Sequence, residues 1–255
     1  MMAAASAPGS LNPVARLLAM LRLILRREGS NLIGIVGHSL LLPAFICYAA
    51  FMIAPNSFET RQSWVLGGIV LALGMTSLTQ VHFAVTSDRL LGGLRLFSAL
   101  GVDDRLYTAA YLAYGTMMAL LVSVTGGAVM VWTGLAPGNA ARLPELLLVG
   151  TLAGLVLASL GVLTGLSVRS FSMGDTVINL LGLVLVLVSP VFYQANALPA
   201  WLAPIGWASP YTHIAALASA LANGAQLDPA SIVALALMGL LLLGLVRHRQ
   251  QRGES

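Results

Sequence analysis

The stretch SPVFYQANALPAWLAPIGWASPYTH, Ser189 to His213, interrupts an otherwise very apolar chain and determines how its last two hydrophobic runs are connected. It places four prolines and two tryptophans between two hydrophobic runs. Proline inside a helix removes a backbone hydrogen bond and clashes with the preceding turn, so one straight helix cannot cover this stretch. After Pro210 an apolar run continues to Ala222, which is too short to cross a bilayer, and Asn223-Gly224 is typical of a helix end.

The composition is that of a membrane protein. Hydrophobic residues make up 58% of the chain and charged residues 9%, whereas soluble domains carry about 25% charged residues. The apolar residues come in long blocks and lack the alternation of a barrel strand, which predicts an all-α polytopic membrane protein. The single cysteine, Cys47, excludes a disulfide framework.

Motifs for nucleotide hydrolysis and metal binding are missing from the sequence. The chain has no lysine, so the phosphate-binding pattern G-x-x-x-x-G-K-[ST] cannot occur. Neither H-E-x-x-H nor a cysteine–histidine spacing for zinc is present. We therefore predict no metal site and no catalytic residue, and we expect the scattered histidines to be packing or interfacial residues: His38, His82, His213 and His248.

Six apolar runs approach the ~20 residues that a membrane-spanning helix needs. They cover residues 32–54, 64–85, 106–132, 146–168, 177–192 and 232–246. Pro144-Glu145, Asp175 and Asp228-Pro229 are start signals for the last three runs. We expect a six-span domain over residues 31–247, a disordered segment over residues 1–11 without a cleavable signal peptide, and a cytoplasmic tail over residues 248–255.

Residues 12–30 are predicted to form an amphipathic helix, with Asn12 as its N-cap and Pro13 at its first position. One side is basic, with Arg16, Arg22, Arg26 and Arg27, and the other is apolar, with Val14, Leu17, Leu18, Leu21 and Leu25. This pattern favours a helix lying on the membrane surface over an amphipathic helix packed on a soluble core.

The arginines predict the orientation. Eleven lie in the N-terminal helix, in the connections that follow the second and fourth spans, and after the last span. The other two, Arg61 and Arg142, lie in connections on the opposite side. Positive residues gather on the cytoplasmic side, so we expect both termini in the cytoplasm of a multi-pass protein of the inner or plasma membrane. Residues 194–227 then form a re-entrant elbow on the outer face, with Trp201 and Trp207 in the interfacial belt. A pair of interfacial helices lying on the surface is the alternative.

The longest internal cytoplasmic connection is TSDRLLGGLRLFSALGVDDRLY, Thr86 to Tyr107. Its apolar residues form a helical stripe, while Arg89 and Arg95 point elsewhere; the stripe consists of Leu90, Leu91, Leu94 and Phe97. Gly101 can end this helix and Asp103 can cap the third span. Such a helix can dock into a groove on a soluble partner, or it can be a passive connector on the lipid headgroups.

Outside the C-terminal tail, the acidic residues all lie at span ends or in connections. A proton-coupled carrier usually has an acidic residue in the middle of a span. These positions argue against proton or sodium coupling, and they indicate that energy arrives from outside the chain. The residues are Glu28, Glu59, Asp88, Asp103, Asp104, Glu145, Asp175 and Asp228.

Together these features resemble the type-2 permeases of ATP-binding-cassette (ABC) exporters, and most of all the drug-resistance and nodulation-type transmembrane subunits. The resemblance covers residues 12–250. Its most specific parts occur in this order: Ser189-Pro190-Val191-Phe192-Tyr193, Leu198-Pro199-x-Trp201-Leu202 and Ser209-Pro210-Tyr211. Many members carry a glutamate and a proline in the connection after the second span, where this chain has Asp88-Arg89 and Leu100-Gly101.

The resemblance implies a dimer with a second copy or a close paralogue, and two cytosolic ATPase subunits that carry ATP and Mg; this chain holds no cofactor and binds no nucleic acid. It implies that residues 12–30 are a connecting helix and that residues 87–101 are a coupling helix. The implied ATPase-coupling residues are Arg89, Leu90, Leu94, Arg95, Phe97, Asp103 and Asp104. Those implied for an external gate are Pro190, Phe192, Tyr193, Pro199, Trp201, Pro210 and Tyr211.

The resemblance also implies that the first, second and fifth spans line the transport pathway at the dimer axis. The polar candidates on these spans are Ser77, Thr79, Gln80 and Asn179. Because no charge lies within a span, we expect an uncharged or amphipathic cargo such as a drug or natural product. A lipid-linked glycan or a lipid is the alternative cargo. An ATP-independent carrier and a membrane-embedded enzyme are alternatives of a different class.

Overall fold

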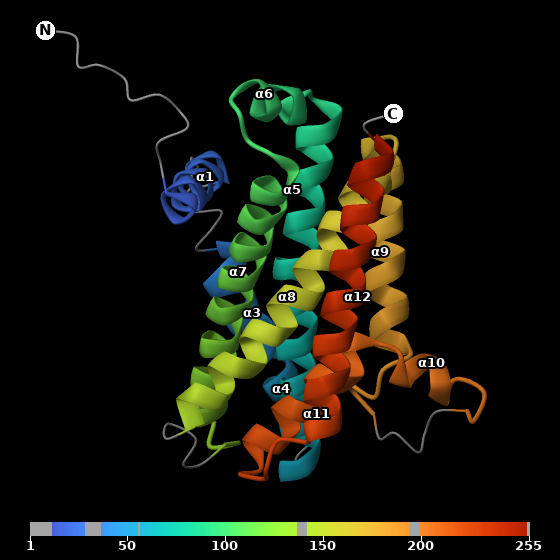
Figure 1. Cartoon of the computed structure of the whole chain (residues 1–255). Coiled ribbons are helices and arrows are strands. Elements are labelled where there is room, and N and C mark those ends of the chain that lie inside the picture. The colour runs from blue at the N-terminus through green and yellow to red at the C-terminus, as the bar shows by residue number, and fades with distance from the viewer. Residues whose placement is uncertain (1–11, 29–36, 56, 137–141, 194–198, 254–255) are drawn as a thin grey trace, which may run out of the picture.

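A computed structural model describes residues 12–28, 37–55, 57–136, 142–193 and 199–253. Helices running along a common axis form the body of the molecule, and no strand occurs within these ranges (Figure 1). The expected disordered segment, residues 1–11, lies outside the described residues.

Within the described residues, four helices are long and apolar enough to cross a membrane. The first combines α4 (Phe58–Leu73), the π-helical turn η3 (Gly74–Leu78) and α5 (Thr79–Leu90); the others are α7 (Asp104–Trp132), α8 (Leu143–Ser167) and α12 (Pro229–Gly253). Two shorter apolar helices are α3 (Leu42–Ile53), which follows the π-turn η2 (Gly37–Leu41), and α9 (Phe171–Leu187). By length, the structure thus supports four of the six predicted spans, and the first and fifth remain predictions.

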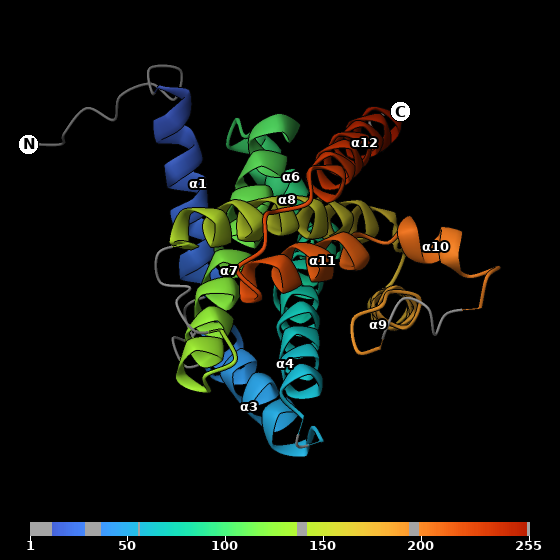
Figure 2. The ribbon, with the colours of Figure 1, turned by 90° about the horizontal axis from the view of Figure 1, so that it is seen from below.

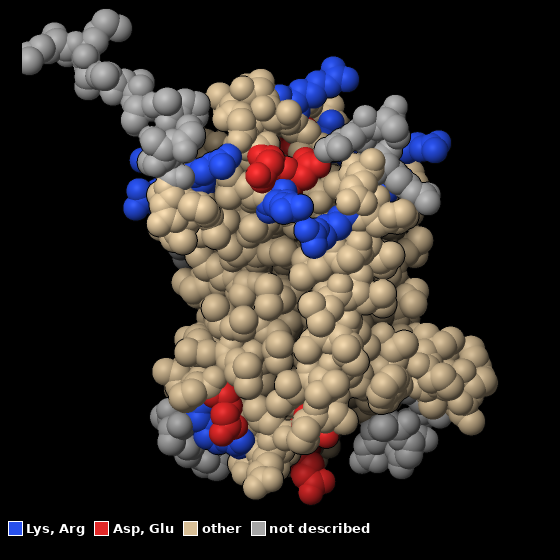
Figure 3. All heavy atoms as spheres, viewed as in Figure 1, with Lys and Arg blue, Asp and Glu red and all other residues tan. Residues whose placement is uncertain are grey.

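Charge separates the two ends of the bundle. We call the end that carries α1 (Pro13–Glu28), α6 (Gly93–Ala99) and the end of α12 the arginine-rich end. α10 (Ala203–Trp207) and α11 (Pro210–Ala222) lie at the opposite end. Figure 3 shows most blue side chains near the arginine-rich end and a broad uncharged belt between the two ends on the face in view. An uncharged belt flanked by charged ends is the pattern of a bilayer-spanning bundle.

Local capping signals place several helix starts as predicted. The side chain of Asn12 accepts the Val14 amide at 3.2 Å, and Asp103 caps α7 by accepting the Leu106 amide at 2.7 Å. The prediction that Asp175 caps the fifth span is wrong. Ser170 is the N-cap of α9, accepting the Met173 amide at 3.2 Å, because its extended backbone lets the helix begin one turn earlier.

The described residues bear on two further predicted boundaries. The N-terminal helix is described as far as Glu28, and residues 29–30 lie outside the described residues. The expected tail at 248–255 is helical to Gly253, because α12 continues past the span. Its last turns are held to α7: Gln250 Nε2 donates to Thr108 Oγ1 at 2.9 Å and to the Asp104 carbonyl at 3.3 Å.

α1 runs across the bundle axis and packs beside α7 (Figures 1 and 2). Met20 and Ile24 are buried in the core at this end, and Leu17, Leu21 and Leu25 pack partly against it. Val14 and Leu18 are exposed. The apolar side of α1 is therefore divided between the bundle and the surroundings, as expected of a helix lying where bundle and membrane surface meet.

α8 crosses the bundle obliquely and approaches its neighbours through glycines (Figure 1). A Cβ at Gly154 would lie 2.7 Å from Cα of Thr116, and one at Gly161 would lie 2.7 Å from the carbonyl oxygen of Leu78. Because these obstacles are backbone atoms, only glycine permits the observed helix separation. Small residues at close helix crossings are the usual means of packing helices in membranes.

Candidate functional site

The predicted coupling segment, residues 87–101, is not one helix. α5 continues to Leu90, a turn at Leu91 and Gly92 follows, and α6 then covers only seven residues. Gly92 has a φ of +82°, in the left-handed region that glycine enters without strain. Gly101, with a φ of +75°, lies just beyond α6, as predicted from its sequence position. The segment is thus a short helix bounded by two glycine turns.

The apolar residues that were predicted to share one stripe do not all face the same way. Phe97 is 8% exposed and packs on the ring of Tyr107 with centroids 5.9 Å apart, while Leu90 and Leu94 are half-buried. The apolar side chains that face outward are Leu91, Leu96 and Leu100, which are 74%, 60% and 62% exposed. The turn at Gly92 rotates α6 relative to α5, so residues on one side in the sequence pattern point in different directions. Docking on an ATPase stays a prediction, and the exposed leucines are the residues that a partner can reach.

The charged residues predicted for coupling lie around this tip. Arg89 is half-buried and donates to the carbonyl of Val168 at the end of α8. Arg95, Asp103 and Asp104 are exposed. Arg89 therefore holds α5 to α8, whereas the other three are accessible to a partner.

A buried polar cluster joins α1, α5 and α7 beneath α6. Asp88 is 3% exposed and forms an ion pair with Arg27. Its Oδ2 atom accepts hydrogen bonds from the hydroxyls of Tyr111 at 2.5 Å and Tyr107 at 3.1 Å, and the Tyr111 hydroxyl accepts one from Arg27 Nη2 at 2.9 Å. A buried carboxylate is costly unless it is paired and hydrogen-bonded, and all of these contacts serve that need.

The sequence analysis missed this cluster, because it places Asp88 only at a span end or in a connection and assigns it no partner. One signal was available: Tyr107 and Tyr111 are four residues apart, so they share one face of α7. A second contact fixes the other end of α1, since Arg16 Nη2 donates to the carbonyl of Gly101 at 2.7 Å. α1 thus contacts the chain both before and after α6, while Arg22 and Arg26 are exposed.

At the opposite end, the two Ser-Pro pairs of the opening stretch meet. The Ser189 and Ser209 hydroxyls are both buried and lie 2.8 Å apart. Both also reach the carbonyl oxygen of Leu185, at 2.6 Å and 3.3 Å. These contacts join the end of α9 to the start of α11.

The residues predicted for the external gate divide into two groups. Phe192 and Tyr211 point inward against glycines: Cβ atoms at Gly67 and Gly74 would lie 2.4 Å from the Phe192 ring and 1.9 Å from the Tyr211 hydroxyl. Pro210 is buried with Tyr211 at the start of α11. The remaining members lie nearer the surface: Pro190 and Tyr193 are half-buried, and Pro199 and Trp201 are exposed.

The predicted elbow, residues 194–227, contains two helices with different surroundings, and residues 194–198 lie outside the described residues. α11 is packed inside the bundle, since Ile214 and Leu217 are fully buried, whereas Ile205 and Trp207 of α10 are exposed. For α11 this favours the re-entrant interpretation over a helix lying on the surface.

His213 and Asp228 connect this elbow to α12. One ring nitrogen of His213, Nε2, lies 2.9 Å from the carbonyl oxygen of Trp207, and Nδ1 lies 3.3 Å from Oγ of Ser231. The Ser231 hydroxyl donates to Asp228 at 2.7 Å, and the amides of Ala230 and Ser231 donate to the same carboxylate. These three hydrogen bonds lower the pKa of Asp228, the one from the Ser231 hydroxyl most.

The predicted pathway residues do not share one environment. Ser77 is buried, 3.5 Å from the carbonyl oxygen of Gly154 on α8, and Gln80 accepts a hydrogen bond from the Tyr114 hydroxyl at 3.1 Å. Thr79 donates to the Gly74 carbonyl at 3.3 Å within its own helix, while Asn179 is exposed on α9. In the described part of the chain, no group of three or more His, Cys, Asp or Glu residues is arranged to hold a metal ion.

A comparison with protein families matches residues 17–221 to the family described as ABC-2 type transporter. The matched region begins in α1 and ends in α11, so it contains α6, the Asp88 cluster and both Ser-Pro pairs. No curated protein matches the chain. Because the family match covers most of the sequence, the chain belongs to the ABC-2 type transporter family.

Proposed function

We propose that this chain is the membrane subunit of an ABC exporter that moves a hydrophobic or amphipathic small molecule, such as a drug or natural product, out of the cytoplasm. Membership of the ABC-2 family makes it a transport permease subunit. We further propose that two separate cytosolic ATPase subunits bind ATP and Mg and drive the transport cycle. The observation that carries it is the exposed apolar tip formed by Leu91, Leu96 and Leu100 at the arginine-rich end.

This tip has the properties of a docking surface. Large apolar side chains in solvent, bordered by charged groups, are typical of protein interaction sites, and a helix face of this kind fits a groove on a soluble partner. Arg95, Asp103 and Asp104 supply the charged border. The short helix α6 between two glycine turns presents the tip away from the bundle.

Movement of the tip can be transmitted because the elements around it are connected. α6 lies between α5 and α7, and α1 contacts the chain on both sides of it through Arg27–Asp88 and Arg16–Gly101. Approach of two ATPases would push α6, and α1, α5 and α7 would tilt together as rigid bodies. At the opposite end, α11 would separate from α4 and open the external gate.

The dimer is part of the proposal. One face of α9 is apolar and exposed, which supports contact with a second copy or a close paralogue at the pathway; it carries Leu180, Leu183, Val184 and Leu187. Asn179 lies on the same helix and is exposed, so it can face cargo at that boundary.

The test is co-purification of the full chain with the ABC-type ATPase encoded next to it, followed by ATP hydrolysis and cargo export in vesicles. We expect the pair to co-purify and a hydrophobic cargo to stimulate hydrolysis. Leu96→Asp should abolish both. The control Gln251→Asp adds the same charge at an exposed position of the same end and should preserve both. Transport by the chain alone without nucleotide would contradict the proposal, as would normal coupling in Leu96→Asp.

A further inference from the structure

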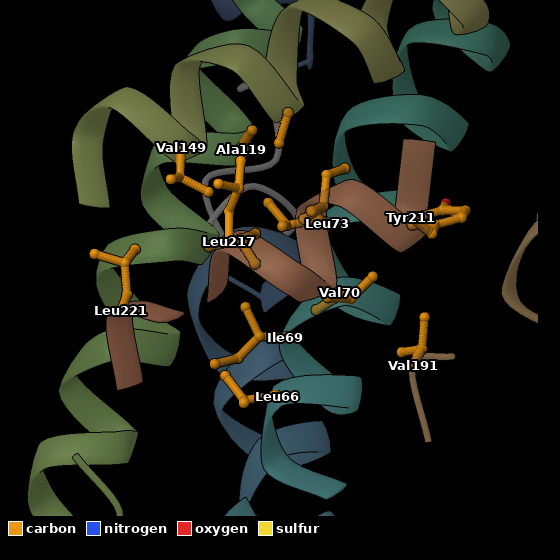
Figure 4. Packing of buried hydrophobic residues seen from close by; sticks show 14 of the residues in the cluster. Leu66, Ile69, Val70, Leu73, Ala119, Val149, Val191, Tyr211, Leu217 and Leu221 are labelled. Carbon is orange, nitrogen blue, oxygen red and sulfur yellow. The ribbon is translucent and has the colours of Figure 1, made fainter. Parts of the chain in front are cut away.

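A cavity of about 620 Å³ lies between α4, α7, α8 and α11, toward the opposite end of the bundle. Its volume is within the range of sites that bind drug-sized ligands, roughly 300–1,000 Å³. Apolar side chains form nearly all of its lining, and the described polar side chains among them are Ser123 and Arg142. Figure 4 labels several of the lining side chains, among them Ile69 and Leu73 on α4, Val149 on α8 and Leu221 on α11.

The cavity opens toward the lipid-facing side of the bundle. Val124, Val131, Trp132 and Leu143 belong to its lining and are exposed, so they form the mouth between α7 and α8. Deeper lining residues are almost completely buried: Leu73, Met130 and Ile214. A molecule in the surrounding bilayer can thus enter sideways, without passing through the protein.

The space exists because two wall positions carry little or no side chain. A Cβ at Gly127 would meet only the tip of Leu146, at 3.1 Å, whereas one at the neighbouring Gly126 would collide with Ile69. Ala218 of α11 is half-buried and belongs to another wall of the cavity. A larger side chain at either Gly127 or Ala218 would project into the space.

Water does not suit this cavity. A buried water molecule needs two to four polar partners, and an apolar cavity without them stays dry. The guanidinium of Arg142 is already occupied by the carbonyl oxygens of Ala220, Leu221 and Ala225 and by its ion pair with Glu145. The occupant that matches an apolar cavity open to a bilayer is a hydrocarbon chain.

We propose that this cavity binds one acyl chain of a membrane phospholipid with a zwitterionic headgroup. Arg142 lies in the lining, and its partner Glu145 is three residues further along α8. The charges of the pair cancel and the Arg142 guanidinium is already hydrogen-bonded, so this end of the cavity offers no net positive charge to hold an anionic headgroup, whereas a zwitterionic headgroup needs none. The bound chain would fill the space between α7 and α11 and stabilise the packing of the re-entrant helix.

The experiment uses the full chain in vesicles of phosphatidylethanolamine and phosphatidylglycerol that contain a trace of phosphatidylcholine with a photoreactive acyl chain. After irradiation, labelled residues are mapped by mass spectrometry. We expect labelling of Leu66 and Ile69, which are shielded from bulk lipid but line the cavity. Ala218→Phe and Gly127→Leu fill the cavity from different walls, and each should reduce this labelling several-fold. The control Ala216→Phe changes an exposed position of the same helix outside the lining and should leave it unchanged.

An insertion control and two alternative photoreactive ligands complete the experiment. Labelling of Leu237 and Leu240, exposed on α12, reports correct insertion and should be equal in all variants. The same photoreactive chain is also supplied as a free fatty acid and as phosphatidylglycerol. Cavity labelling that persists in both filled variants, or that is absent from the native chain, overturns the site. Stronger labelling by the fatty acid or by phosphatidylglycerol overturns the zwitterionic phospholipid as its occupant.

Discussion

Arg27 on α1 forms an ion pair with Asp88 at the end of α5, sixty-one residues further along the chain. The carboxylate is almost fully buried, whereas the Arg27 side chain is 39% exposed. The pair therefore joins a helix that crosses the bundle axis to the base of the α5–α6–α7 segment, which we propose receives force from an ATPase.

Replacing Arg27 by alanine should destabilise the protein. Asp88 would keep its tyrosine hydrogen bonds but lose its cation, and an under-satisfied buried charged group costs about 1–3 kcal/mol or more. Thermal unfolding in detergent measures the loss. Arg26→Ala, an exposed neighbour on the same helix, is the control and should have little effect. Asp88→Asn added to Arg27→Ala should recover part of the loss, and equal stability of Arg27→Ala and the native chain would contradict this reading of the cluster.

The two faces of α6 should respond differently to truncation. Phe97→Ala removes a buried ring that packs on Tyr107, so we expect a loss of about 3–5 kcal/mol in unfolding free energy. Leu96→Ala removes an exposed side chain and should leave stability nearly unchanged while weakening ATPase binding. Thermal melts and affinity measurements on the same preparations separate the two effects. The reverse pattern would mean that α6 is rotated relative to its position in this structure.

Gly161→Ala should loosen the contact of α8 with η3 and the start of α5. Its Cβ would lie 2.7 Å from the backbone carbonyl of Leu78, which cannot rotate away. Overpacking of this kind costs typically 1–3 kcal/mol. Gly182→Ala is the matched control, because no described atom lies within 4 Å of the Cβ that it adds. Unfolding in detergent should show a lower melting temperature for Gly161→Ala alone.

Ser189 and Ser209 should be coupled energetically. Each alanine substitution removes one hydroxyl from the buried contact between α9 and α11. Side-chain hydrogen bonds between membrane helices contribute about 0.6 kcal/mol on average in double-mutant cycles. We expect a coupling of this order from the two single variants and the double variant, measured by unfolding. Strictly additive losses would show that the two hydroxyls act independently.

Asp228 should make the start of α12 sensitive to acid. Its pKa is lowered by hydrogen bonds from the Ser231 hydroxyl and two backbone amides. The stabilisation is therefore complete above the pKa of an unfolded aspartate, about 3.9, and it is lost as the pH falls through the lower pKa of the folded protein. Asp228→Asn cannot titrate, so the native chain should be more stable at neutral pH and the difference should shrink in acid. A difference that does not change with pH would rule out this role.

Much of the helical framework could be predicted because its causes are local. Asn12, Asp103 and Asp228 cap helices through contacts within three residues, and Gly101 ends α6 through its own backbone conformation. Asp175 failed as a predicted cap because Ser170, five residues earlier, begins the same helix. The ABC-2 family resemblance was likewise readable from the order of the Ser-Pro segments, and the family match confirms it.

The order of residues is enough to show that the chain forms apolar helices, where many of them begin, and that a proline-rich stretch separates the last two runs. Which polar groups meet can be seen only in the folded molecule: Arg27 pairs with Asp88, and Ser189 with Ser209. It also decided that Phe97 points inward while Leu96 points outward. The two kinds of feature differ in how far along the chain their causes lie. Caps and helix periodicity depend on neighbours within a turn, whereas these contacts depend on how whole helices cross, and that crossing is set by close packing at positions such as Gly154 and Gly161.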